Sequence, residues 1–360
     1  MSAKDNVAAF DLDQVEIELK KYGESTVQFD RPIGETLSIV QTNGSWDGKD
    51  WPQTPRADYL ARVNAMCREW GPKLTVRFYG HYGDVFDGRS VHQFPDAHSL
   101  SVNCIHEAEN VDAIGELPHL SRLSVGIYEL KDKALLSKLP LERLTHLTLT
   151  ATETKALDLA PLADAKALQK LYLEGHHKNI AALANLNGLQ EFTFNAKKGL
   201  DLSFINGMSD LRALKFNLGG TESIENIALD RLQDIAFTKV RGLSELGDMQ
   251  RFPALRRLLA QDLQQFARIK FGAANQKLEH LHFFNCGKLT RIEGLAQCPQ
   301  LLSLRWLFTD IDPASLDLPK SLTHLHMLSG KRSDEAREKE AIEAMGYIAG
   351  DHRNASFSYK

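Results

Sequence analysis

The sequence has no long apolar segment and few cysteines. No apolar run approaches the roughly 18 residues that a membrane-spanning helix needs, and the first segment, MSAKDNVAAFDLDQ, has acids where a signal peptide would need an apolar stretch. Only four of the 360 residues are cysteines and no CxxC pair occurs, which argues against a disulfide framework. We therefore expect a cytoplasmic protein without a membrane segment; the alternative is export without a signal peptide.

A strong charge imbalance is also missing. Lysine and arginine number 43 against 47 acidic residues, a net charge of -4 that gives no reason to expect nucleic acid as a partner. The 43% hydrophobic content is enough for a large core and excludes disorder as the main state. GxSxG, P-loop, HExxH and dinucleotide-binding motifs are all absent, which favours a binding protein over an enzyme. We predict no cofactor and no metal.

Leucine, by contrast, is abundant and very unevenly distributed. Of 52 leucines, five lie in residues 1–96, 47 in residues 97–330 and none in residues 331–360. Within the rich stretch the unit L-x-x-L-x-L recurs eleven times at intervals of 21 to 24 residues, which indicates a repeat architecture. The middle positions of the eleven units are Leu100, Leu123, Leu147, Leu171, Phe192, Leu214, Ile235, Leu258, Leu281, Leu304 and Leu325.

Each unit predicts one short strand, because its middle and last apolar positions point to the same face. The segments between units must return the chain to a parallel start, so the strands stack about 4.8 Å apart into a curved parallel sheet. The pattern resembles the leucine-rich repeat family in its short form of about 22 residues, common in bacteria. The resemblance covers about two thirds of the chain and implies an α/β solenoid of about eleven repeats.

The best copy of the family pattern runs from Leu278 to Leu301. There, Cys286 occupies the position, five residues after the middle leucine, where the family has Asn or Cys. Elsewhere only Thr152 and Thr309 are plausible replacements, and His176 departs from the pattern. We therefore predict that the side-chain hydrogen-bond ladder of the family is mostly absent.

The flanks predict caps for the two ends of the solenoid. We expect an α+β cap in residues 1–96, repeats in residues 97–330, and a helical cap with a tail in residues 331–360. The first cap is predicted to hold helices near 13–21 and 55–70 and strands near 26–29, 36–40 and 74–78. The last of these strands reads as a degenerate first repeat, with Leu74 and Val76 matching Leu100 and Val102. Ser333 is expected to cap the final helix, which would cover the last repeat with Ala336, Ile342, Ala344 and Met345.

Two groups in the first cap could carry chemistry. One loop holds His81, Asp84, Asp87, His92, Asp96 and His98, but the spacing fits no metal motif and these are ordinary loop residues. Trp46 and Trp51 flank two aspartates and could stack on a sugar, although a turn anchored by two half-buried indoles is the simpler interpretation.

Strand alternation also predicts which residues lie on the open face of the sheet. Near the C-terminal end they form an exposed apolar ridge bordered by histidines and an arginine, a composition typical of a binding interface. We call this set the C-terminal ridge: Phe284, Leu307 and Leu328 with His280, His282, Arg305, His324 and His326. The alternative is that the terminal cap folds over the ridge. The histidines are too widely spaced or too few for a metal site.

A second set of open-face residues lies in the first half of the repeats. Arg122, His146 and Lys170 occupy successive strands, with Tyr172 beside them. We call the first three the basic rail, which suits an acidic protein surface; the alternative is a solvated sheet face without a partner.

The resemblance and the missing motifs together predict a non-enzymatic protein that binds a partner protein on the concave face, as a monomer or weak dimer. Such a binder could be an immunity protein that neutralises a toxin, an inhibitor or a scaffold. The alternatives are a secreted effector, or an enzyme whose catalytic site lies in residues 1–96 with the repeats recruiting its substrate. Some bacterial leucine-rich repeat effectors carry a ubiquitin-ligase domain with a Cys-x-Asp motif, and no cysteine here has that Asp.

Overall fold

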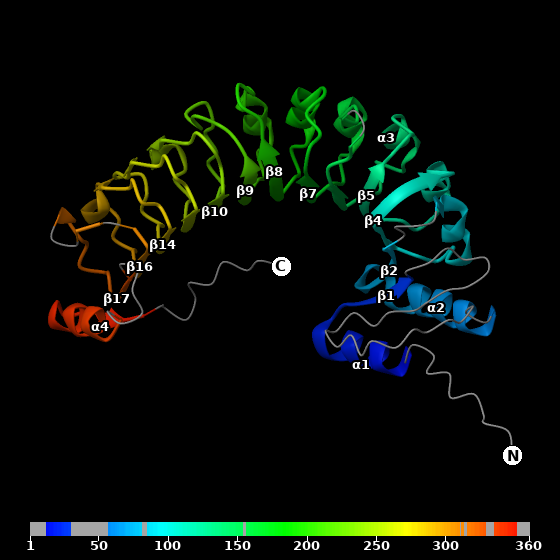
Figure 1. The fold of residues 1–360 in the computed structure, drawn as a ribbon, viewed down its shortest axis with the longest axis horizontal. Coiled ribbons are helices and arrows are strands. Elements are labelled where there is room, and N and C mark those ends of the chain that lie inside the picture. Colours follow the sequence, from blue (N-terminus) through cyan, green and yellow to red (C-terminus); the bar gives the residue numbers. More distant parts are fainter. Residues whose placement is uncertain are drawn as a thin grey trace, which may run out of the picture. The chain divides into compact units, whose positions relative to one another are not determined.

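The computed structural model describes residues 12–29, 57–80, 85–153, 156–309, 311–312, 315–328 and 335–350. The chain divides into two compact units, residues 1–182 (unit 1) and residues 183–360 (unit 2). In each unit, short parallel strands form one side and turns with short 3-10 helices form the other (Figure 1). The division falls inside the predicted repeats, and the cap boundaries at residues 96 and 330 stay predictions.

Unit 1 contains a parallel sheet whose strands lie in the order β1, β2, β4, β5, β6, β7, with β3 against the far end of β4. The strands are β1 (Ser25–Phe29), β2 (Leu74–Tyr79), β3 (Val85–Asp87), β4 (Ser99–Glu109), β5 (Arg122–Glu129), β6 (His146–Leu149) and β7 (Lys170–Leu173). The helices are α1 (Leu12–Tyr22), α2 (Ala57–Trp70) and α3 (Leu135–Lys138). The 3-10 segments are η1 (Gly71–Lys73), η2 (Gly88–Gln93), η3 (Val111–Glu116), η4 (Ala160–Asp164) and η5 (Ile180–Asn185).

Four of the elements predicted in residues 1–96 are present in the structure. Both helices and the strands at β1 and β2 form, and β2 pairs directly with the first repeat strand, β4. The predicted register is wrong by two residues, because Val76 pairs with Leu100 and Phe78 with Val102. The predicted strand at 36–40, Trp46, Trp51, His81 and Asp84 lie outside the described residues.

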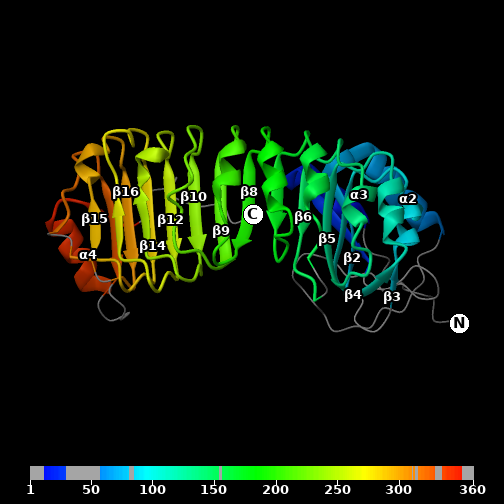
Figure 2. The ribbon, with the colours of Figure 1, turned by 90° about the horizontal axis from the view of Figure 1, so that it is seen from above.

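Unit 2 continues the same pattern of one strand per repeat. Its main sheet has the order β8 (Glu191–Ala196), β9 (Ala213–Gly219), β10 (Asp234–Thr238), β12 (Arg257–Gln261), β14 (His280–Phe284), β16 (Ser303–Leu307), β17 (His324–Leu328) and β18 (Ile348–Ala349). Figure 2 shows these strands running side by side. A second parallel sheet consists of β11 (Glu245–Asp248), β13 (Arg268–Lys270) and β15 (Arg291–Glu293). The short helices are η6 (Ser203–Gly207), η7 (Met249–Arg251), η8 (Leu295–Gln297) and α4 (Glu335–Ala344).

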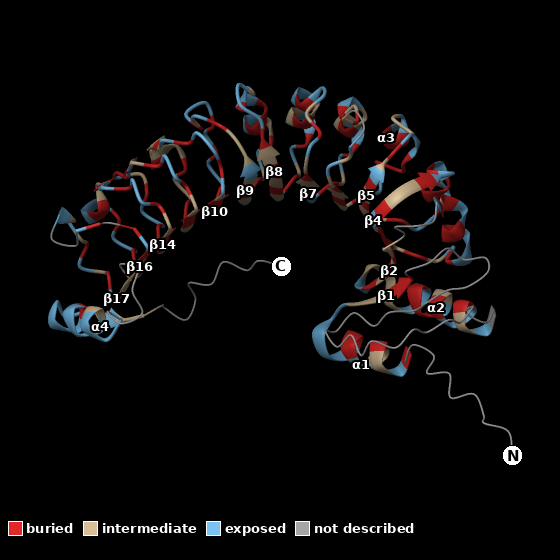
Figure 3. Ribbon diagram, in the orientation of Figure 1, coloured by how far each residue is buried: buried red, intermediate tan, exposed pale blue. Residues whose placement is uncertain are grey.

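The core of each unit consists of the repeated apolar positions. All eleven middle positions are at most 3% exposed, and within each unit they pair with one another in register, as Leu123 does with Leu147 and Leu258 with Leu281. Burial alternates along the strands, as Figure 3 shows in red and tan. The strands, their spacing and their parallel register confirm the predicted fold: the chain is a leucine-rich repeat solenoid.

Phenylalanines fill the third position of three consecutive repeats in unit 2. The rings of Phe194 and Phe216 lie 5.0 Å apart, as do those of Phe216 and Phe237. Such contacts stabilise neighbouring repeats beyond the burial of the rings, by about 0.5–1.5 kcal/mol each. The aromatic column therefore ties successive repeats together at the centre of the unit 2 core.

The position that the family fills with Asn or Cys bonds to the backbone more often than the sequence predicts. The backbone N–H of Cys286 donates to Thr309 Oγ1 at 3.2 Å, and both residues occupy the position at which the sequence analysis allowed a ladder bond. His176, which was predicted to depart from the ladder, is 1% exposed. Its Nδ1 accepts from the Leu157 N–H at 3.1 Å and its Nε2 contacts the Thr150 carbonyl at 3.0 Å. The imidazole thus performs the bonding expected of an asparagine.

In five repeats of unit 2, one residue at the end of the strand or just after it adopts the left-handed conformation. The residues lie four positions after the middle leucine, with φ between 51° and 62°: Leu218, Lys239, Asp262, Asn285 and Phe308. For residues other than glycine this conformation costs about 1–2 kcal/mol. The last four of them donate their N–H to the next strand at 2.7–3.0 Å, which offsets part of that cost.

Only one of the four residues predicted to cover the last repeat is buried. The helix forms as α4 and Ile342 is 2% exposed, but Ala336, Ala344 and Met345 are exposed rather than packed on the last repeat. The predicted cap residue Ser333 lies outside the described residues. Within the described ranges, no helix combines the length and the apolar character needed to cross a membrane.

Candidate functional site

The open sheet face of unit 1 presents the basic rail as predicted. Arg122 pairs with His146 and His146 with Lys170, so the three lie directly across adjacent strands. Arg122, His146 and Tyr172 are half-buried and Lys170 is exposed. We call this surface the unit 1 face. It is formed by the outward residues of β2, β4, β5, β6 and β7 that lie one position before, and one and three positions after, the middle apolar residue of each strand. The parallel register brings together side chains that are 24 residues apart in the sequence.

Arg122 lies at the centre of the unit 1 face. Its Nε is buried and has no hydrogen-bond partner, and within the described ranges no ion pair involves its guanidinium. Two strands away, the Arg77 Nε donates to Asn103 Oδ1 at 2.9 Å and its Nη1 donates to Gln28 Oε1 at 3.2 Å. Because both acceptors are neutral amides, these bonds orient Arg77 without offsetting its charge.

A hydroxyl of the preceding residue orients His146. Thr145 Oγ1 donates to the Ser121 carbonyl at 3.0 Å and lies 2.9 Å from His146 Nδ1. A hydroxyl has one proton, which is used for Ser121, so His146 Nδ1 must donate to Thr145. This bond fixes the orientation of the ring on the sheet face.

Small side chains occupy the middle of the unit 1 face. Ser101, Ser124 and Thr148 lie across three adjacent strands. Gly126 follows in the next row, where a Cβ would come within 2.6 Å of Thr150 Oγ1. The absence of large side chains here lets the backbone of another chain approach the sheet closely.

The C-terminal ridge is less exposed than the sequence predicts. His280 and His282 are 1% and 7% exposed, and Leu307 is 6% exposed, so the expectation that these three lie open to a partner is wrong. Each lies on the predicted face of its strand, and neighbouring side chains close over it. The other predicted residues of the ridge are half-buried: Phe284, Arg305, His324, His326 and Leu328.

An aromatic pair next to the ridge was missed by the sequence analysis. Phe308 is 40% exposed, and its ring meets that of Phe284 edge to face at 5.4 Å between centroids. Strand alternation gives no signal for Phe308, because it lies just after β16 in the left-handed conformation that turns its side chain out of the core.

The four residues of the predicted loop that the structure describes make structural contacts. Asp87 caps η2 and binds Arg89, whose hydrogen bonds lower the pKa of the carboxyl to about 2. Asp96 accepts from Arg68 and Asn64. His92 lies 2.9 Å from Glu116, and His98 stacks on His119 with its pKa lowered, first by burial. These contacts account for the four residues of the loop that the structure describes.

One cluster of three residues that could bind a metal ion occurs within the described ranges. The side chains of His106, Glu107 and Glu129 bring one ligand atom each within 4.8 Å of the others, at the far ends of β4 and β5. Glu107 already accepts from Lys131 Nζ at 2.9 Å, which lowers the pKa of its carboxyl. The cluster is therefore occupied by an internal cation, and it lies outside the unit 1 face.

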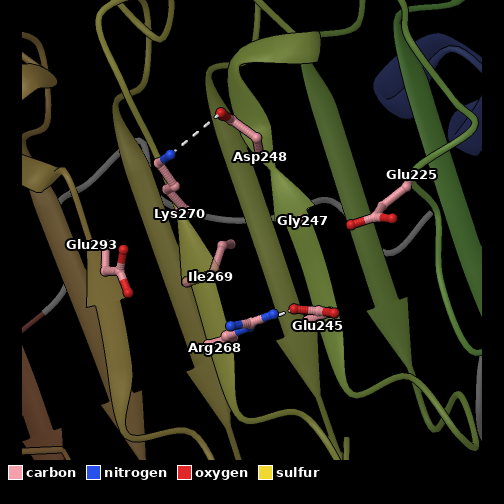
Figure 4. Close-up of a pocket in the computed structure, with 8 residues that line it drawn as sticks. All are labelled: Glu225, Glu245, Gly247, Asp248, Arg268, Ile269, Lys270 and Glu293. Atoms are coloured by element: carbon pink, nitrogen blue, oxygen red, sulfur yellow. Dashed lines mark hydrogen bonds and ion pairs between the residues drawn. The ribbon is translucent and has the colours of Figure 1, made fainter.

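The second sheet of unit 2 carries a groove of about 230 Å³ (Figure 4). It is lined by Glu225, Glu245, Gly247, Asp248, Arg268, Ile269, Lys270 and Glu293. Arg268 pairs with Glu245, and Lys270 Nζ lies 3.8 Å from Asp248. Because Ile269 is buried, the groove has little apolar surface. Most of its charged groups are already paired, and exposed ion pairs contribute little energy.

No protein-family model matches the chain, and no curated protein matches its sequence. It is similar to the solved structure of an internalin from Listeria monocytogenes, at 17% identity over 83% of this chain and 94% of the internalin, with a TM-score of 0.48. A leucine-rich repeat protein from Leptospira interrogans is 12% identical over 78% of this chain and 91% of its own, with a TM-score of 0.43. Internalin C2 from Listeria monocytogenes is 17% identical over 67% of this chain and 83% of its own, with a TM-score of 0.35.

Proposed function

We propose that this leucine-rich repeat solenoid is a non-enzymatic protein that binds another protein on the unit 1 face, with the basic rail and Tyr172 at the centre of the contact. The observation that carries the proposal is the in-register row of Arg122, His146 and Lys170 across three adjacent strands. These polar groups share a rigid sheet whose opposite face is buried core. A preformed surface of this kind loses little conformational entropy when a partner binds.

The unit 1 face also has the composition of a contact surface. It combines arginine and tyrosine, which contribute most to protein interfaces, with small residues that allow close approach. Tyr172 is half-buried, and its hydroxyl donates to Glu174 Oε2 at 3.3 Å. This bond holds the ring beside Lys170, in the same strand.

The accessible part of the C-terminal ridge is proposed as a second contact. Phe284, Arg305, His324, His326 and Leu328 keep partial exposure and adjoin the aromatic ring of Phe308. The buried His280, His282 and Leu307 would support this surface from below rather than touch the partner. An immunity protein, an inhibitor and a scaffold are the roles that a rigid binder of this kind suits.

The alternative of an enzyme in residues 1–96, or of a secreted effector, has less support. Asp87, His92 and Asp96, the described members of the predicted loop within that region, are engaged in structural bonds. An enzymatic alternative would gain support if residues 1–96 altered a substrate covalently in a way that point substitutions in that region abolish.

Site-specific photo-crosslinking tests the proposed function. A photoreactive amino acid at Ser124, on the unit 1 face, should give a discrete crosslinked partner in the cells that make the protein. The same group at Lys166, an exposed turn residue of the same unit, is the matched control and should give none. Crosslinking at Lys166 alone, or at neither position while the folded protein is present, would contradict the proposal.

A further inference from the structure

The charge on the unit 1 face differs from that of the whole chain. Three rows of outward residues cross β2, β4, β5, β6 and β7: Thr75, Arg77, Tyr79, Ser99, Ser101, Asn103, Arg122, Ser124, Gly126, His146, Thr148, Thr150, Lys170, Tyr172 and Glu174. The carboxylates of Asp87, Glu107, Glu109 and Glu129 lie beyond these rows, toward the far ends of β3, β4 and β5. The three rows include three permanent cations and one carboxylate, whereas the chain as a whole has a net charge of -4. The face is therefore locally positive on an acidic protein, which selects for partners with negative charge.

Within the described residues, neither arginine of the face has a carboxylate partner. The Arg77 guanidinium lies over the Tyr79 ring at 4.3 Å and is hydrogen-bonded only to neutral amides in the described contacts. Arg122 has a buried Nε without a hydrogen-bond partner. Because desolvated cations gain most from a carboxylate that arrives with a partner, both positions favour an acidic ligand.

The three cations are regularly spaced across the strands but do not lie in one row. Arg77 lies on β2, Arg122 on β5 and Lys170 on β7, so each is two strands from the next in the sheet order. Arg77 is level with Ser124, so it lies two residues, about 7 Å, further along its strand than Arg122 and Lys170. Two strand spacings amount to roughly 10 Å. A polyproline II segment rises about 3.1 Å per residue and has three residues per turn, so every third side chain lies on one side, about 9 Å apart.

We infer that the unit 1 face binds an extended acidic segment of its partner protein, with carboxylates at about every third residue facing Arg77, Arg122 and Lys170. Between the cations, Gly126 leaves room for the segment's backbone, and the half-buried Ser124 and Thr148 offer it hydroxyl groups for hydrogen bonds. This inference rests on the proposed function, because it specifies the chemistry of the partner on the same surface.

The test uses a fluorescent peptide with glutamates at every third position, separated by proline and alanine, and the full-length chain. Fluorescence anisotropy should show saturable binding that weakens as salt is added. Arg122→Gln and Lys170→Glu should each weaken binding about tenfold or more, while the matched charge reversal Lys166→Glu leaves it unchanged. Circular dichroism and thermal melts confirm that each variant folds.

Two control peptides sharpen the result. One has lysine in place of every glutamate and should not bind; the other has the same composition with its glutamates adjacent and should bind more weakly. The inference is overturned if the lysine peptide binds equally, or if Arg122→Gln and Lys170→Glu leave binding intact. A partner that still crosslinks at Ser124 in that case leaves the proposed function standing and removes only the acidic segment.

Discussion

The buried imidazole of His176 gives the sharpest test of how the repeats are held together. Its Nδ1 accepts the Leu157 N–H, so its other nitrogen must carry the proton that is donated to the Thr150 carbonyl. Replacing His176 with leucine fills most of the same volume but leaves both backbone groups without a partner. The substitution therefore separates hydrogen bonding from packing at a residue that is 1% exposed.

The expected loss follows from the two orphaned groups. Each buried donor or acceptor without a partner costs about 1–3 kcal/mol, so His176→Leu should lower the free energy of unfolding by about 2–6 kcal/mol. His176→Asn, whose amide can accept from one group and donate to the other, should recover part of the loss. His92→Leu is the control, because His92 is 44% exposed and contacts only Glu116 in the described contacts, and it should cost no more than about 1 kcal/mol.

The same residue predicts a pH dependence. Burial lowers the pKa of His176 below its ordinary value of 6.5, so under acid conditions the unfolded chain binds a proton that the folded chain does not. The contribution of neutral His176 is fully present above pH 6.5 and is lost as the pH falls below it, by at most about 1.4 kcal/mol per pH unit. His176→Asn should remove this part of the acid destabilisation.

Urea denaturation followed by circular dichroism, at about pH 7.5 and about pH 5.5, measures both effects. If His176→Leu unfolds within about 0.5 kcal/mol of the unmodified protein at the higher pH, the two hydrogen bonds contribute nothing and the reasoning is refuted. An unchanged pH dependence in His176→Asn would refute the titration argument separately.

Three further predictions concern local geometry. Gly219→Ala should lower the melting temperature more than Gly199→Ala does. Both glycines have φ of 75°, but only at Gly219 would the new Cβ meet another atom, the Ala196 carbonyl oxygen at 2.2 Å. Equal losses in the two variants would exclude the clash. Leu218→Asn should raise the free energy of unfolding by about 1 kcal/mol, because asparagine adopts the left-handed conformation (φ is 62° here) more readily than leucine. Little packing should be lost, since the leucine side chain is 43% exposed. A decrease would show that the leucine makes stabilising contacts. In a DTNB titration of the native protein, the exposed Cys104 should react first. The other three thiols are buried, and burial raises their pKa to about 11 or 12. A second thiol that reacts equally fast would contradict this burial.

The fold was predictable because the core repeats a simple pattern. A strand needs apolar side chains at alternate positions, and eleven regularly spaced copies define both the strands and their register. The one register error has a clear cause: Leu74, Val76 and Phe78 are all apolar at alternate positions, so the sequence offers two equivalent alignments with Leu100. Packing against β4 selects the alignment that places Val76 beside Leu100.

The candidate site was only partly predictable because alternation gives the face of a side chain and not its exposure. His282 lies on the predicted face, yet it is 7% exposed between Leu259 and Arg305 on the adjacent strands. Larger neighbours shield a residue on a sheet, and their conformations are not encoded in a local pattern. The exposure of Phe308 was not predicted for a related reason. It depends on a left-handed backbone conformation, which a phenylalanine does not favour.

One local arrangement recurs on the sheet faces of both units and connects the fold to the proposed function. The sequence Thr-His-Leu occurs at Thr145 and at Thr323, and in both copies the threonine Oγ1 donates to a carbonyl of the preceding repeat and lies 2.9 Å from the histidine Nδ1. The backbone of one repeat thus orients an imidazole of the next. Because stacking of the repeats already fixes the side chain, the histidine loses little further freedom on binding. The same contacts that stabilise the solenoid therefore prepare its open face for a partner.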